Sequence, residues 1–274
     1  MPELPEVETI VRQLKPSIEG RIIEKTRINR LNQWVNPRRD RKLVNGNRII
    51  NVSRRAKYID LALDNGHHLI IHLRMTGKLM LKDAGSDYEP YTRTVFYLDD
   101  KTRLCFMDTR TLGRLEVIGD DQHDAYFKKC GIEPLSEDFQ IDALRRLVLN
   151  SKQQIKDFLL DQSKIAGIGN IYANEIMFRC GIHPERRTFR LNETDIQLLF
   201  RHIPDVLSAA IARMGTTLGN KVSDYRNVYN IDGDYQNMLK VYGRTNLPCS
   251  ECGTPIKRIV QKGRSSFYCE KCQI

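Results

Sequence analysis

Four cysteines near the C-terminus have the spacing of a metal site. They form two C-x2-C pairs separated by sixteen residues, and they are Cys249, Cys252, Cys269 and Cys272. Four soft thiolates within tetrahedral reach are what a structural Zn²⁺ requires, and they leave no ligand position vacant for catalysis. Redox pairs or free thiols are the alternative interpretation. The spacing predicts one structural zinc on a β-hairpin.

The chain begins MPELPEVETI, which places an imino acid and a carboxylate side by side at its start. Pro5 suits the first turn of a helix, where its missing N–H needs no partner, but this does not explain Pro2 and Glu3. If Met1 is removed, Pro2 becomes a secondary amine with a pKa near ~8. Such an amine can attack a carbonyl-like carbon, for example a sugar C1′. Glu3 could then protonate the opened sugar oxygen.

Two further stretches favour contacts with phosphate. In IAGIGNIYANEI, two glycines precede Asn170 at a predicted helix start, a geometry that binds an anion or forms an ordinary N-cap. Lys152 and Lys156 lie shortly upstream and add positive charge. In QKGRSSFY, Gly263 permits a tight turn with Arg264 at its tip, which by itself would be an ordinary surface arginine.

Other candidate side chains lie at the ends of predicted strands. Lys57 starts a strand behind two arginines, His72 and Met75 end an apolar strand, and Arg110 precedes Leu112 in a predicted turn. Each of these also fits ordinary structure, since a methionine in such a position usually belongs to a core.

These residues need two kinds of scaffold. Between residues 20 and 119, runs rich in β-branched and aromatic residues predict antiparallel strands in a sandwich or barrel. These runs are RIIEKTRI, KYIDLAL, HHLIIHLRM, RTVFYLDD, TRLCFMD and GRLEVIG. After residue 133 the period becomes helical, with helices expected at 141–149, 155–160, 171–180 and 194–214, the last kinked or split at Pro204. We expect domains at 1–133, 134–238 and 239–274, with a polar loop at about 216–238.

The composition favours a polyanionic partner. Lys and Arg number 44 against 34 Asp and Glu, which gives a net charge of +10. Seven cysteines, an odd number, argue against a secreted disulfide framework. The sequence has no apolar run of about 18 residues, and the acidic start lacks the features of a signal peptide. A cytoplasmic protein without a membrane partner is therefore expected.

Taken in order, the motifs MPELPEVET, RRAKY, HLRMTG, DTRTLG, AGIGNIY and the cysteine module resemble bacterial formamidopyrimidine-DNA glycosylases over nearly the whole chain. The resemblance implies an α+β multidomain protein with an N-terminal antiparallel β-sandwich, a helix–two-turns–helix domain and a C-terminal β-hairpin zinc finger. It implies excision of oxidised purines, 8-oxoguanine and formamidopyrimidines, from double-stranded DNA, followed by β,δ-elimination at the abasic site. It also implies a nucleoid-associated monomer without a small-molecule cofactor.

The resemblance also assigns roles to residues. Pro2 resembles the Schiff-base nucleophile, Glu3 the general acid, Lys57 the proton donor for β-elimination and Arg264 the donor for δ-elimination. Glu6 matches another acidic residue of the family's active site. Positions that resemble DNA contacts are His72, Met75, Tyr91, Arg110, Leu112, Lys152, Asn170 and Tyr242, to which the charge argument adds Lys156.

The chain departs from the family pattern at three places. Leu112 stands where phenylalanine is usual, Tyr91 and Arg93 stand where histidines are frequent, and the polar loop begins MGTTLGN. None of these changes touches Pro2 or Glu3.

Two other functions remain open from the sequence. The Leu112 departure leaves room for the endonuclease VIII-like sister class, which favours oxidised pyrimidines, although Leu4-Pro5 resembles the purine branch. A non-enzymatic zinc-ribbon protein that binds DNA would show the same charge and cysteines, but it would have no use for Pro2 beside Glu3.

Overall fold

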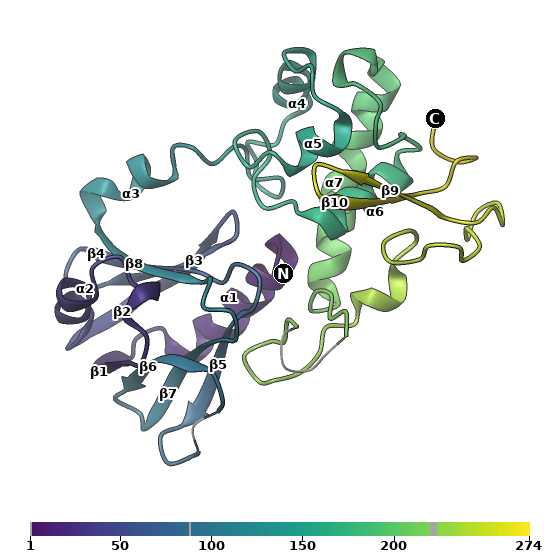
Figure 1. Cartoon of the computed structure of the whole chain (residues 1–274). Coiled ribbons are helices and arrows are strands. Elements are labelled where there is room, and N and C mark those ends of the chain that lie inside the picture. The colour runs from purple at the N-terminus through teal and green to yellow at the C-terminus, as the bar shows by residue number, and fades with distance from the viewer. Residues whose placement is uncertain (1, 88, 220–223) are drawn as a thin grey trace. The chain divides into compact units, whose positions relative to one another are not determined.

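The computed structural model describes residues 2–87, 89–219 and 224–274 of the chain. They form two compact units, the first of Met1–Lys128 with Arg213–Gln236 and the second of Lys129–Ala212 with Asn237–Ile274. Figure 1 shows the elements of each unit. Within the described residues, none of the helices has both the length and the apolar character needed to cross a membrane.

The first unit is built on an antiparallel sheet of eight strands in the order β5-β7-β6-β1-β2-β3-β4-β8. Their bounds are β1 Ile22–Ile28, β2 Asn47–Arg55, β3 Tyr58–Leu63, β4 His67–His72, β5 Gly77–Asp83, β6 Thr92–Leu98, β7 Thr102–Asp108 and β8 Arg114–Gly119. The β1–β2 pairing is short, since it joins only Ile22 to Arg48 and Ile23 to Asn47. The sheet therefore consists of two four-stranded halves.

Both halves contribute side chains to one apolar core. Alternate residues point inward, for example Ile59, Leu61 and Leu63 of β3, because successive side chains of a strand lie on opposite faces. The helix α1, Leu4–Ile18, packs on β2 and β3 and buries Ile10 and Leu14 in the same core. This packing fixes the start of α1 against the sheet.

Several elements of this unit differ from the sequence-based expectation. The pattern predicted neither β2 nor β5, and it did not predict the helices α2, Pro37–Val44, and α3, Asp120–Phe127. The strand expected to run through Met75 ends at His72, because Arg74 adopts the left-handed conformation with φ 53°. That early end turns Met75 out of the sheet into a connecting turn.

The second unit contains four α-helices: α4 Ile141–Leu149, α5 Ile155–Leu160, α6 Asn170–Arg179 and α7 Glu193–Ala212. The predicted helices at 141–149 and 155–160 have the observed bounds. Of the two alternatives expected at Pro204, a kink or a split, the split is excluded, because α7 runs through this residue as a single helix.

The last part of the chain forms a small β-hairpin, with β9 at Lys257–Gln261 and β10 at Arg264–Tyr268. Its core is small, comprising Phe178, Val241, Ile256, Phe267 and two cysteines. The fold is thus α+β, with an antiparallel sheet, a helical part and a C-terminal hairpin, as expected. The predicted domain bounds stay a prediction, although residues 213–236 pack with the first unit rather than with the helices.

Candidate functional site

Pro2 and Glu3 are both buried immediately before α1. The backbone N–H of Glu3 donates a hydrogen bond to Glu6 Oε2 at 2.8 Å, a contact that satisfies one of the unpaired donors at the helix start. A carboxylate in the first turn is also favoured by the helix dipole. The local sequence therefore holds Glu3 at the start of the helix.

Glu6 also holds the segment 214–217, which the prediction placed at the start of the polar loop. Its Oε1 accepts the backbone N–H of Thr216 at 2.8 Å. Gly215 has φ 79°, and a Cβ there would lie 2.6 Å from Glu6 Oε1, so only glycine fits. The two oxygens of one buried carboxylate thus join the N-terminus of α1 to the base of that loop. Residues 220–223 of the predicted loop lie outside the described residues.

Lys57 occupies the tight turn between β2 and β3, directly before β3 as the sequence predicts. Ala56 before it has φ 54°, which shows how sharply the chain reverses. Lys57 is buried, and its charge acts on His72 of the neighbouring strand β4. The structure therefore brings these two predicted site residues together.

His72 is neutral at physiological pH. Burial first, and then the positive charges of Arg74 and Lys57, lower the pKa of His72 to about 3. Its Nδ1 accepts the backbone N–H of Arg74 at 2.9 Å, so the single ring hydrogen sits on Nε2. This imidazole can donate a hydrogen bond to phosphate but carries no charge to it.

Met75, Arg110 and Leu112 come from two turns, one after β4 and one after β7. Met75 and Leu112 are large apolar side chains that are 43% and 42% exposed. Arg110 Nη1 lies 3.4 Å from Met75 Sδ, so the two turns meet at their tips. The structure therefore presents an exposed arginine and two exposed apolar side chains from adjacent turns.

A buried carboxylate holds both turns, and sequence analysis did not single it out. Asp108 Oδ1 accepts the Thr76 hydroxyl at 2.5 Å and the Arg110 backbone N–H at 3.2 Å. Its Oδ2 accepts the Gly113 backbone N–H at 2.7 Å and the Gln33 amide at 2.8 Å. An aspartate at a strand end, five residues before a glycine, was the available signal. Only its burial shows that it organises the turns.

Tyr91 lies next to the same turn, with φ 66° and a side chain that is largely exposed. Its carbonyl accepts the backbone N–H of Asp108 at 3.1 Å. The Arg93 guanidinium carbon lies 5.6 Å from the centre of the Tyr91 ring, and Arg93 Nε donates to the Asp108 carbonyl at 2.7 Å. The two departures from the family pattern thus form a contact of their own.

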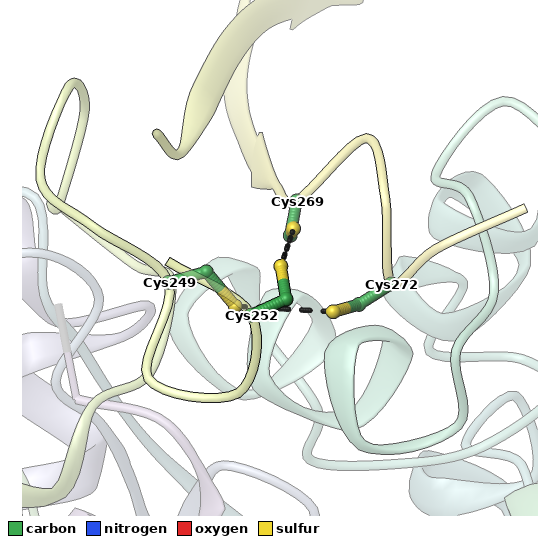
Figure 2. A group of neighbouring side chains, drawn as sticks. All are labelled: Cys249, Cys252, Cys269 and Cys272. Atoms are coloured by element: carbon green, nitrogen blue, oxygen red, sulfur yellow. Dashed lines mark hydrogen bonds between the residues drawn. The ribbon is translucent and has the colours of Figure 1, made fainter. Parts of the chain in front are cut away.

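In the second unit, the four cysteines of the predicted metal site converge. Figure 2 shows their side chains pointing toward one another, and their Sγ atoms all lie within 4.8 Å. Cys252 and Cys269 sulfurs are 3.4 Å apart, and Cys249 and Cys272 sulfurs are 3.9 Å apart. A tetrahedral zinc with Zn–S bonds of ~2.3 Å separates its sulfurs by ~3.8 Å. The donor set and spacing therefore fit one structural Zn²⁺.

Arg264 lies at the tip of the β9–β10 hairpin and is exposed. Lys262 and Gly263 both have positive φ, at 45° and 75°, as a two-residue hairpin turn requires. Glycine satisfies that requirement at Gly263 without strain. The turn predicted from QKGRSSFY is therefore present.

Lys156 is placed differently from the expectation that it contacts phosphate. Its side chain is completely buried, and Nζ donates to the Ser265 carbonyl at 2.7 Å and to Ser266 Oγ at 2.6 Å. Burial, followed by the charge of Arg264, lowers the pKa of Lys156 to about 8. This ammonium supports the hairpin from beneath and does not face solvent.

Asn170 begins α6, as predicted, and its Nδ2 donates to the same Ser265 carbonyl at 3.1 Å. One turn later, Asn174 Oδ1 accepts the backbone N–H of Phe267 at 2.7 Å.

Glu175 of the same helix accepts the backbone N–H groups of Lys240, Val241 and Tyr242 at 2.8 to 3.1 Å. The first turns of α6 thus position the hairpin and the segment containing the half-buried Tyr242, whereas Lys152 is exposed before α5.

Comparison with known families gives matches to three successive parts of the chain. Residues 1–115 match the formamidopyrimidine-DNA glycosylase N-terminal domain, and residues 130–222 match the H2TH domain of the same glycosylases. Residues 246–274 match a zinc finger found in FPG and IleRS.

Full-length relatives agree with these matches. The chain is 41% identical to the formamidopyrimidine-DNA glycosylase of Syntrophomonas wolfei, and the alignment covers 100% of both chains. It is similar to the Lactococcus lactis Fpg in complex with DNA that contains an abasic site, with a TM-score of 0.92 at 35% identity over 99% of both chains. A variant of that protein with a Fapy-dG containing DNA gives a TM-score of 0.93 at 36% identity, again over 99% of both chains.

Proposed function

The chain belongs to the formamidopyrimidine-DNA glycosylase family, and we propose that it excises oxidised purines from duplex DNA and then cleaves the abasic site. It is a DNA glycosylase of base excision repair with damaged duplex DNA as its partner. The observation that carries the residue-level proposal is the buried Pro2–Glu3 pair at the start of α1, held there by Glu6. Because its substrate is DNA, we place the enzyme in the cytoplasm at the nucleoid.

Pro2 is the proposed nucleophile once Met1 has been removed. The pyrrolidine nitrogen attacks C1′ of the damaged nucleotide, the N–C1′ bond forms, and the bond from C1′ to the base breaks. The base departs with the bonding electron pair and takes up a proton, while the pyrrolidine nitrogen loses its own proton and regains a lone pair. The uncharged secondary amine, with its free lone pair, is the reactive form of Pro2.

Glu3 is the proposed general acid, because it is adjacent to the nucleophile and buried with it. It gives its proton to O4′, the C1′–O4′ bond breaks, and the nitrogen lone pair forms an iminium with C1′. The iminium acidifies C2′–H, so loss of that proton expels the 3′-phosphate in β-elimination. A second elimination expels the 5′-phosphate, and hydrolysis of the iminium ion releases the sugar remnant as an aldehyde and restores Pro2.

Lys57 and Arg264 are the proposed proton donors for the two eliminations. Lys57 lies in a sharp turn of the first unit, buried near the neutral His72. Arg264 lies at an exposed hairpin tip in the second unit, where a guanidinium can also grip phosphate in bidentate fashion. Both assignments follow the resemblance, and the experiments below test the covalent step on which they depend.

Met75, Arg110 and Leu112 are proposed to fill the gap left when the damaged nucleotide rotates out of the duplex. Extrusion costs a few kcal/mol, and apolar wedges with an arginine are the usual means of stabilising the opened stack. Two exposed apolar side chains beside an exposed arginine supply that set. Leu112 buries less area than an aromatic ring and cannot stack on a base.

Phosphate contacts are proposed for both units. In the first, the neutral His72 donates through Nε2–H, and Tyr91 through its hydroxyl. In the second, the exposed Lys152 and Arg264 supply charge, while Asn170 and Tyr242 supply uncharged donors. Zinc supplies no step: when bound to the four thiolates it fixes the hairpin that carries Arg264.

Borohydride reduction tests the proposed nucleophile. The enzyme is incubated with duplexes carrying 8-oxoguanine, a formamidopyrimidine, an oxidised pyrimidine or an abasic site, and covalent complexes are counted after reduction. We expect trapping on purine lesions and abasic sites, little on the pyrimidine, and at least a hundredfold less with Pro2→Gly.

Pro16→Ala is the matched control, because it removes an exposed proline from the last turn of the same helix. It should trap like the wild type. Normal trapping by Pro2→Gly would contradict the assignment of the nucleophile, and trapping chiefly on the pyrimidine would favour the sister class. Binding without any trapping by Met1-processed protein would favour a non-enzymatic DNA-binding protein.

A further inference from the structure

The first unit contains a second cluster of metal-ligating side chains that none of the proposed steps uses. Asp60 of β3, His68 of β4 and His123 of α3 place one ligand atom each within 4.8 Å of the others. His68 Nδ1 lies 2.8 Å from Asp60 Oδ1, and His123 Nε2 lies 2.7 Å from Asp60 Oδ2. Two neighbouring strands and a helix that is distant in sequence therefore converge on one carboxylate.

The cluster lies on the face of the β3–β4 pair that is turned away from the main core. Odd-numbered residues of these strands, such as Ile59 and Leu69, belong to that core, so Asp60 and His68 lie on the other face. The helix α3 covers them there and contributes His123. Asp60 is 4% exposed, whereas the side chain of His123 is 31% exposed. The donors are therefore sheltered but reachable from solvent.

The outer contacts of the histidines follow the pattern of metal sites. Metal-bound imidazoles usually donate their second N–H to a carboxylate or carbonyl, which orients the ring and raises its basicity. His68 Nε2 lies 2.8 Å from Asp120 Oδ1, so a metal on Nδ1 would complete a carboxylate–histidine–metal arrangement. On the other ring, His123 Nδ1 lies 3.9 Å from Asp124 Oδ1. Both rings thus have a carboxylate on the side away from Asp60.

We propose that Asp60, His68 and His123 bind a divalent first-row transition ion, Zn²⁺ foremost, at a site separate from the four cysteines. Two imidazole nitrogens and a carboxylate are donors that Zn²⁺ accepts at ~2.0–2.2 Å, with water in the fourth position. Tetrahedral bonds of that length separate ligand atoms by ~3.3 Å, so the present hydrogen-bonded spacing would have to widen by about half an ångström. The ion would replace the protons that now join the rings to Asp60.

The proposed ion would fasten α3 to the sheet. Besides His123, α3 packs on this face through Phe127, whose ring centre lies 5.5 Å from that of Tyr58. The helix spans only eight residues, and its Tyr126 hydroxyl also donates a hydrogen bond to Glu116 Oε2 of β8 at 3.2 Å. A metal bond to His123 would add a further link between this helix and the sheet.

A zinc titration tests the proposal on the full-length enzyme purified with its finger loaded. Zinc bound per chain is counted by elemental mass spectrometry after equilibration with Zn²⁺ at pH 7.5 and gel filtration, and affinity is measured by calorimetry. We expect two zinc ions per chain in the wild type, and one in His123→Gln and in the double variant His68→Gln/His123→Gln. Asp120→Asn should retain the second ion with about 10- to 100-fold weaker affinity.

His67→Gln is the matched control, because it removes the preceding residue of β4, which the alternation of the strand places on the opposite face. It should still bind two ions. A thermal melt with and without added Zn²⁺ accompanies each titration, and only proteins with the second site should melt higher with zinc. His123→Gln keeps the proposal testable if the double variant folds poorly, because His123 is a partly exposed side chain at the surface.

Three results would overturn the proposal. One zinc ion in the wild type at saturating Zn²⁺ would mean that Asp60, His68 and His123 only form hydrogen bonds with one another. A second ion that persists in both histidine variants would lie elsewhere on the protein. Loss of the second ion in His67→Gln would likewise exclude the assigned ligands.

Discussion

The paired turns of the first unit and the hairpin of the second unit are both proposed to touch DNA, yet they are held in different ways. The turns carrying Met75 and Arg110 extend from a sheet with a large apolar core, and one carboxylate, Asp108, gathers their backbone. The hairpin has a core of only a few side chains and is held by four thiolates and by the ammonium of Lys156. In the first region, polar contacts fix the conformation of the turns on a sheet that is stable without them. In the second region, the thiolates and Lys156 are needed for the hairpin to fold at all.

This difference indicates which contacts stabilise the fold and which only shape the surface that is proposed to contact DNA. In the first unit, loss of the polar contacts should disturb the turns while the sheet persists, because the core is independent of them. In the second, loss of the metal removes the main support of the hairpin, because small modules seldom bury enough apolar area to fold alone. Variants should therefore separate into those that alter recognition and those that abolish the finger.

The largest effect is expected from loss of the zinc site. Cys249→Ser should unfold the hairpin, because structural zinc contributes on the order of 10 kcal/mol to such modules. DNA affinity should fall at least a hundredfold in a fluorescence anisotropy titration, while the first unit retains its cooperative melt. Cys130→Ser, a change at a cysteine outside the cluster, should leave both unchanged. Wild-type affinity in Cys249→Ser would show that the hairpin does not depend on the metal.

The next largest effect is expected from Asp108→Asn. The amide keeps one acceptor oxygen but turns an NH₂ group toward N–H donors, so buried donors lose their partner at a cost of about 3 kcal/mol. Urea denaturation measures this loss, and 2-aminopurine fluorescence beside the lesion measures base extrusion, which should fall about tenfold. Asp99→Asn in the exposed β6–β7 turn is the control. Unchanged extrusion would contradict the role given to Asp108.

A smaller effect is expected from Lys156→Met. This variant distinguishes a lysine that supports the hairpin from one that contacts phosphate. The change leaves the Ser265 carbonyl without its ammonium donor but also removes a charge whose pKa burial lowers to about 8. We expect a destabilisation of about 1–2 kcal/mol and an unchanged salt dependence of DNA binding. Lys152→Met should instead lower the log–log salt slope by about one, as for one lost phosphate contact. Equal slopes in the two variants would reverse these assignments.

The smallest effect concerns the pH dependence contributed by His72. The unfolded chain protonates this ring near its ordinary pKa of 6.5, and the folded chain does so only near 3. The unfolded state therefore binds more protons between these values, so this residue lowers stability as the pH falls below 6.5. Between pH 7 and pH 5, the free energy of unfolding measured by urea denaturation should fall by about 1–2 kcal/mol less in His72→Gln than in the wild type. Parallel curves would show that the ring titrates normally.

The sequence predicted those parts of the fold in which periodicity was uninterrupted. Helices α4 and α5 have their predicted bounds because their apolar residues recur at helical spacing. Strand β2 escaped prediction because its register shifts between Ile49 and Asn51, which breaks the alternation. Strand β5 escaped because it is buried on both faces at Leu79 and Met80 and reads as a continuous apolar run.

Candidate site residues could be predicted where they belong to a recognisable motif. They could not be predicted where the role of a side chain depends on its burial in the fold. The cysteine spacing indicates the metal site directly, whereas the roles of Pro2 and Glu3 rest on the order of motifs and stay a prediction. The sequence could not show that Asp108 holds the two turns or that Lys156 is buried beneath the hairpin. No sequence pattern states which charged side chains are buried. The cluster of Asp60 and His123 depends on contacts between residues 63 positions apart, which only the fold brings together.

The most direct test of the account is the site of the covalent bond to DNA. Enzyme and 8-oxoguanine duplex are reduced with borohydride, digested, and sequenced by mass spectrometry. We predict that the deoxyribose remnant is attached to the nitrogen of Pro2 at the start of the processed chain. Attachment to a lysine side chain, such as that of Lys57, would contradict it.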